Sequence, residues 1–154
     1  MIQRIQTLYL AIAAALAGVL LNGIIISLVG AEGEAFTLTY KGISILRNGI
    51  SEMLEKSLPL TILLIAVPLL YFMAIFLFKN RKLQIRIVVL TTLLNAGSFL
   101  LILYYILYAG NKFEAAFVFN LKITFPVIGV ILGYLAFRSI LKDELLVKSY
   151  DRIR

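Results

Sequence analysis

The sequence predicts an all-α membrane protein: a bundle of four transmembrane helices that carries a small extracytoplasmic antiparallel β-sheet. Three observations predict this fold. Hydrophobic residues make up 62% of the 154 residues, whereas a soluble domain is about half apolar. Four apolar stretches are each long enough to cross a hydrocarbon core, which takes about 20 helical residues. The charged residues, 15% of the chain, fall mainly in short segments between these stretches.

The four predicted spans form a single membrane domain that covers the whole chain. They lie at residues 5–29, 58–78, 87–108 and 125–141. Helices satisfy their own backbone inside lipid, whereas strands would need a closed barrel. The first span is longer than the core of a signal peptide, which has about 7–15 residues, so we expect it to be retained.

The distribution of Lys and Arg predicts how the chain is oriented. Ten of these residues lie near the N-terminus, in the loop 79–86 (the basic loop), at Arg138 and in the segment 142–154 (the tail). The other five lie in the loops 30–57 and 109–124. The side with more basic residues is normally cytoplasmic. We therefore expect the basic loop and both termini in the cytoplasm, and the two longer loops outside it.

The outer loops carry patterns typical of strands. Apolar and polar residues alternate over 36–41, and 43–46 can return as a second strand after a turn at Gly42. Residues 50–56 predict a short helix at the membrane surface. Alternation over 113–123 predicts one more strand from the third loop.

The alternative for both outer loops is an irregular conformation in which Phe and Tyr side chains lie among the lipid headgroups. Four spans capped by a small sheet are also the arrangement of claudin-like proteins. That analogy concerns the fold alone and carries no function.

The composition excludes several kinds of site. The chain has no Cys and no His, so disulfides, thiolate chemistry and nucleophile–His pairs are absent and the commonest metal ligand is missing. The sequence also shows no pair of acidic residues and no activated nucleophile in a pattern typical of a catalytic site. We expect no enzyme activity, no cofactor and no metal. The net charge of +7 fits orientation rather than nucleic-acid binding, because the basic residues flank apolar spans.

Two groups of residues inside the spans are candidates for specific roles. Gly129 and Gly133 form a GxxxG pair, which predicts close helix packing, either within the bundle or between two copies of the chain. Thr91, Asn95 and Ser98 share one face of the third span. They predict either a polar pocket for a ligand or hydrogen bonds to neighbouring helices.

A candidate interaction surface lies on the cytoplasmic side, where we expect an acidic residue of the tail to pair with the cations of the basic loop. Its members are Lys79, Arg81, Lys82, Arg86, Asp143, Glu144, Asp151 and Arg152. In the tail, Leu146, Tyr150 and Ile153 fall on one helical face. The tail therefore predicts an amphipathic helix that docks a protein partner or the membrane surface. The alternative role of the basic loop is orientation and contact with anionic headgroups.

Two runs of sequence are specific in order as well as in composition. One is KNRKLQIR at 79–86, and the other is the ending KDELLVKSYDRIR at 142–154. With the opening MIQRIQTLY, they resemble the four-span membrane proteins of Bacteroidota grouped as domain of unknown function 4293. The resemblance extends over essentially the whole chain through the pattern of spans. It implies a bacterial inner-membrane location, and it brings no established activity and no catalytic residues.

The leading functional expectation is a non-enzymatic scaffold, assembly factor or regulatory partner of a membrane complex. The alternative is binding or transport of a lipid or other apolar small molecule within the bundle. No span has an ionisable residue at its centre. Since proton relays and ion pathways usually need one, an ion-coupled transporter is disfavoured.

Overall fold

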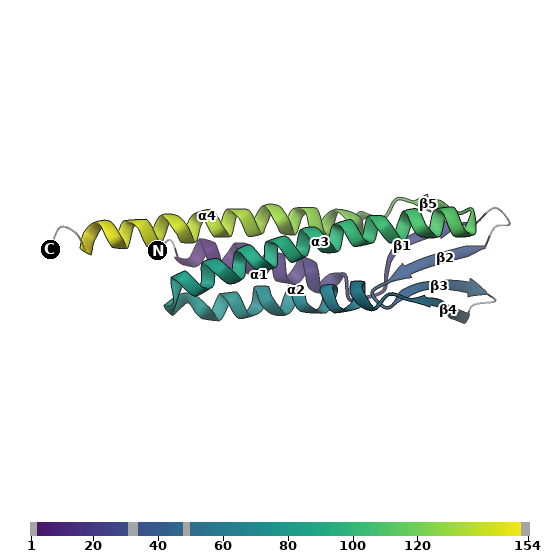
Figure 1. The fold of residues 1–154 in the computed structure, drawn as a ribbon, viewed down its shortest axis with the longest axis horizontal. Helices are drawn as coiled ribbons and strands as arrows, with labels where there is room; N and C mark the ends of the chain where they lie inside the picture. The colour runs from purple at the N-terminus through teal and green to yellow at the C-terminus, as the bar shows by residue number, and fades with distance from the viewer. Residues whose placement is uncertain (1–2, 31–33, 48–49, 152–154) are drawn as a thin grey trace.

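The computed structural model describes residues 3–30, 34–47 and 50–151, and within them it contains four α-helices and five strands (Figure 1). The helices are α1 (Gln3–Val19), α2 (Leu58–Phe76), α3 (Arg81–Phe113) and α4 (Phe125–Asp151). The strands are β1 (Ile24–Val29), β2 (Ala35–Thr39), β3 (Gly42–Arg47), β4 (Ile50–Lys56) and β5 (Ala116–Val118). The 3₁₀ turns η1 (Leu77–Lys79) and η2 (Leu121–Thr124) precede α3 and α4.

The molecule is elongated, with the helices side by side and the sheet at one end (Figure 1). α1 packs against α2 and α4, and α3 packs against the same two helices. Both chain ends lie at the end opposite the sheet. Within the described residues, three helical segments are long and apolar enough to cross a membrane, at Leu58–Lys79, Arg81–Phe113 and Leu121–Leu146. These segments identify a mainly helical membrane protein.

The first apolar stretch is not one helix, so the expectation of a helical span over 5–29 is wrong. α1 ends at Val19, and backbone hydrogen bonds three residues apart continue a tight turn to Asn22. Gly23 then has a φ of +73°, a backbone conformation that residues other than glycine rarely adopt. The isoleucines after it begin β1, which lies between β2 and β5. A continuous apolar run fits a buried strand as well as a helix, so hydropathy could not separate the two.

The sheet is antiparallel, with strand order β4-β3-β2-β1-β5. β2 and β3 confirm the two strands predicted around Gly42. That glycine has a φ of +144°, and a Cβ on it would overlap the backbone carbonyl of Glu55, so the turn requires glycine. β4 replaces the short helix expected over 50–56, and that expectation is wrong. Its residues pair with β3, so its backbone hydrogen bonds run across the sheet instead of along a helix.

The segment between α3 and α4 contains less strand than the alternation over 113–123 predicted. α3 continues to Phe113 and ends at Glu114, whose φ of 47° is left-handed. Only the short β5 pairs with β1. η2 follows, and there the Asn120 side chain accepts a hydrogen bond from the Lys122 amide. A left-handed helix end and a side-chain-capped turn therefore override the period-2 pattern.

α3 and α4 extend past the spans predicted at 87–108 and 125–141. α3 begins at Arg81, inside the basic loop. α4 begins at Phe125, which leaves Pro126 in the first turn, where a proline costs no helical hydrogen bond. The same helix continues to Asp151, so the described part of the tail is helical as expected.

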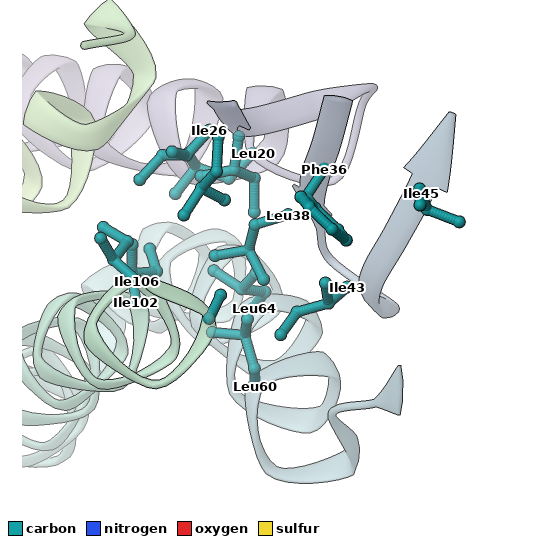
Figure 2. Packing of buried hydrophobic residues seen from close by; sticks show 13 residues of the cluster. Leu20, Ile26, Phe36, Leu38, Ile43, Ile45, Leu60, Leu64, Ile102 and Ile106 are labelled. Carbon is teal, nitrogen blue, oxygen red and sulfur yellow. The ribbon is translucent and has the colours of Figure 1, made fainter. Parts of the chain in front are cut away.

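Two clusters of buried side chains hold the elements together. The larger one joins the sheet to the bundle and includes Leu38 of β2, Leu64 of α2 and Ile102 of α3 (Figure 2). The second lies between the helices and includes Leu10 of α1 and Ile140 of α4. Burying one such side chain fully contributes about 1.5–3 kcal/mol. Because the buried face of the sheet packs directly on α2 and α3, sheet and helices share one core.

Candidate functional site

The basic loop surrounds a hollow at the end of the molecule that carries both chain ends. The chain turns there through η1 into the first turn of α3. The hollow, which we call the basic hollow, has a volume of about 630 Å³. It is lined by Lys79, Asn80, Arg81, Lys82, Leu83, Arg86 and Glu144. Four cations and one carboxylate give this lining a formal charge of +3, and a concave surface of that charge attracts anions.

Asp143 joins three helices beside the basic hollow. This residue is only 7% exposed, and its Oδ2 accepts a hydrogen bond from Nε2 of Gln6 at 2.5 Å. Nη1 of Arg81 donates to the backbone carbonyl of Asp143 at 2.9 Å. These bonds attach the base of the tail to α1 and α3. Asp143 therefore contacts the basic loop through its backbone, while its carboxylate binds an uncharged amide.

The other acidic and basic residues of the predicted surface occupy different places. Glu144 lines the basic hollow together with the four cations. Asp151 is the last helical residue of α4. Arg152 and Ile153 lie outside the described residues. Pairing between the tail carboxylates and the side chains of the basic loop remains a prediction.

The polar residues of the third span are buried between helices. Thr91 and Ser98 each donate to the backbone carbonyl four residues earlier, at 2.7 and 3.0 Å. Asn95 is 2% exposed, and its Nδ2 donates across to the carbonyl of Pro126 on α4 at 3.1 Å. Only the Asn95 bond joins two helices, because the Thr91 and Ser98 bonds lie within α3. A role for the same residues in binding a lipid or small molecule remains a prediction.

Gly129 and Gly133 are buried where α4 faces α3 and α2. A Cβ on Gly129 would overlap the side chain of Asn95, and one on Gly133 would overlap Thr92. The hydroxyl of Tyr71 on α2 donates to the Gly129 carbonyl at 3.2 Å. The two glycines therefore provide the space that polar side chains of neighbouring helices occupy.

Sequence reasoning missed three residues that tie the helices together, namely Gln6, Tyr71 and Gln84. Gln84 is 4% exposed, and its Nε2 donates to the carbonyl of Ala74 on α2 at 2.9 Å. One signal for Tyr71 was available, because tyrosines of membrane helices gather at the interfaces and this one lies inside a span. The two glutamines belong to the motifs MIQRIQTLY and KNRKLQIR, but nothing in those motifs indicates a contact between helices.

A second polar cluster lies at the sheet end and joins β4 to the last turns of α3. Nζ of Lys112 forms an ion pair with Glu55 and donates to the Tyr108 hydroxyl at 3.0 Å. That hydroxyl donates to Oε1 of Glu55 at 3.1 Å. The hydrogen bond to Glu55 raises the pKa of Lys112 to about 12. The same bond lowers the pKa of Glu55 below its ordinary value of 4.5, so both groups stay charged at neutral pH and clamp the strand.

The described residues contain no group of three or more His, Cys, Asp or Glu side chains placed to hold a metal ion. The Asp143 and Glu55 carboxylates bind an amide and an ammonium group of the chain itself.

Comparison with known proteins places the chain in one family. A family model described as Domain of unknown function (DUF4293) matches residues 2–153. The chain belongs to this family. No curated protein and no solved structure matches it. Membership in the DUF4293 family confirms the resemblance predicted from the motifs of the basic loop and the tail. The family has no described activity that could be assigned to the basic hollow.

Proposed function

We propose that this DUF4293 protein crosses the bacterial inner membrane four times and acts as a non-enzymatic scaffold or assembly partner of a membrane complex. In this proposal the end with both termini faces the cytoplasm and the sheet lies on the other side. The excess of Lys and Arg at that end supports the orientation. α1 and its closing turn run from Gln3 to Asn22, and at 1.5 Å per residue they extend about 30 Å, enough for a fourth crossing.

The observation that carries the proposal is the projection of α4 beyond the other helices at the end with both termini (Figure 1). Asp143 anchors the base of this projection to Gln6 and Arg81. Beyond the anchor, Leu145 and Leu146 are 57% and 43% exposed. A helix held at its base that exposes leucines past it presents apolar anchors to a groove on a protein partner.

The test is in-cell crosslinking, then purification in mild detergent and mass spectrometry of everything retained. The full chain is compared with a chain truncated after Glu144, which keeps Asp143 and its contacts. Leu145→Ser is the point variant. Phe78→Ser, which removes a 52% exposed apolar side chain at the same end, is the matched control. We expect a stoichiometric protein partner that is lost on truncation and in Leu145→Ser but kept in Phe78→Ser.

Equal retention of the partner by all four chains would show that α4 is not the docking element and would overturn the proposal. A defined lipid or small molecule retained without any protein would replace it with the lipid-binding alternative. Thermal unfolding in detergent confirms that each variant is folded before its partners are compared.

A further inference from the structure

An apolar groove lies along the contact between α3 and α4. Its volume is about 260 Å³, and apolar atoms form its accessible lining. The residues around it are Val89, Thr92, Leu93, Tyr134 and Phe137. Val89 and Tyr134 are 39% and 56% exposed, so the groove opens at the surface of the helices, where lipid would contact it.

Helical spacing places this groove and the basic hollow on the same side of the molecule. On α3, Arg86 lies three residues before Val89 and seven before Leu93, so the three side chains share one face. On α4, Glu144 follows Phe137 by seven residues and shares its face in the same way. Three residues of helix correspond to about 4.5 Å along the axis. Arg86 therefore lies less than one turn beyond the apolar groove, and Lys82 lies one turn farther along the same helix.

We propose that the two hollows together bind one anionic phospholipid, with its phosphate in the basic hollow and an acyl chain in the apolar groove. Arginine and lysine donors bind phosphate oxygens through charge-assisted hydrogen bonds. Arg81 is already held in place by its bond to the Asp143 carbonyl. The net charge of +3 in the basic hollow complements a phosphodiester. A free phosphate ion would leave the apolar groove empty, whereas the acyl chain of a phospholipid would fill it.

This inference rests on the placement of α3 and α4 across the membrane in the proposed function, and it needs no protein partner. The test uses the purified full chain in detergent, with lipid binding measured by native mass spectrometry. The probes are dioleoylphosphatidylglycerol and, as a neutral comparison, dioleoylphosphatidylcholine. We expect one phosphatidylglycerol bound per chain, in preference to phosphatidylcholine.

The charged half of the site is tested with the double variant Lys82→Gln/Arg86→Gln. Each cation that contacts the bound phosphate should change phosphatidylglycerol binding about fivefold, so the double variant should bind it about 25-fold more weakly. Arg138→Gln/Lys142→Gln is the matched control. It removes the same charge from two exposed residues that do not line the basic hollow, and its affinity should equal that of the unmodified chain.

The apolar half is tested with Val89→Trp, which fills the groove without changing the charge. We expect it to lose phosphatidylglycerol binding while its thermal unfolding stays close to that of the unmodified chain. Four results would each overturn the proposed lipid site. Two concern the variants: equal weakening of phosphatidylglycerol binding in both double variants, or full binding by Val89→Trp. The other two are displacement of the lipid by inorganic phosphate and equal binding of phosphatidylcholine. Because no partner is present, failure of the docking role of α4 leaves this result unchanged.

Discussion

The contact between α3 and α4 can be tested by the addition of one carbon atom at Gly133. In Gly133→Ala the new Cβ would overlap Oγ1 of Thr92, and it would lie 2.9 Å from the Tyr71 hydroxyl and 3.3 Å from Cβ of Thr92. Thr92 cannot turn away freely, because its Oγ1 donates to the Val88 carbonyl at 2.7 Å. The helices must therefore separate slightly or a hydrogen bond must break.

The size of the effect follows from three contributions. Overpacking costs about 1–3 kcal/mol, and a lost hydrogen bond between membrane helices costs about 0.6 kcal/mol. Replacing Gly by Ala in a helix returns about 1 kcal/mol. Gly133→Ala should thus lower the free energy of unfolding by about 0.6–2.6 kcal/mol. Gly97→Ala is the matched control, since its Cβ would have no neighbour within 4 Å, and it should be up to about 1 kcal/mol more stable than the unmodified chain.

The assay is reversible unfolding in mixed micelles with increasing dodecyl sulfate, followed by circular dichroism. If Gly133→Ala proved as stable as Gly97→Ala, the packing argument would be refuted. Light scattering of the same samples separates the two roles that the GxxxG pair allows. A change from dimer to monomer at unchanged stability would assign the glycines to a contact between two copies instead of within one.

Two further predictions concern the sheet end and the orientation. The folded pKa of Lys112 is raised from 10.5 to about 12, so its contribution to stability is complete below 10.5 and is lost as pH rises through about 12. The pKa of Glu55 is lowered, so its contribution is present above 4.5 and is lost as pH falls through the folded value. The difference in unfolding free energy between Lys112→Met and the unmodified chain should therefore be constant from about pH 5 to 10 and shrink on either side; a difference that grows in acid would contradict the ion pair. The chain has no Cys, so the single variants Glu52→Cys and Leu145→Cys can report on which side of the membrane each residue lies. An impermeant maleimide should label Cys at position 52 in intact spheroplasts and Cys at position 145 only after lysis. The reverse labelling pattern would show that the orientation is inverted.

The sequence by itself determined the three long spans, the start of α4, and the strands β2 and β3. Each of these depends on a local property: an apolar run of lipid length, a flanking charge, a proline in a first turn, or the alternation of residues such as Phe36 and Leu38. The ordered motifs of the basic loop and the tail were likewise enough to indicate the family. They also placed the cations of the basic hollow close together, because those residues lie within eight positions of one another.

Only the tertiary structure decided the elements and contacts that depend on a partner. Ile24–Val29 becomes β1 because β2 and β5 satisfy its backbone on both sides, and a hydropathy pattern contains no information about such neighbours. The bond between Gln6 and Asp143 joins residues 137 positions apart. The apolar groove exists only where α3 packs on α4. Local patterns fix which face of a helix is apolar, but the packing of one helix on another decides which residues meet there.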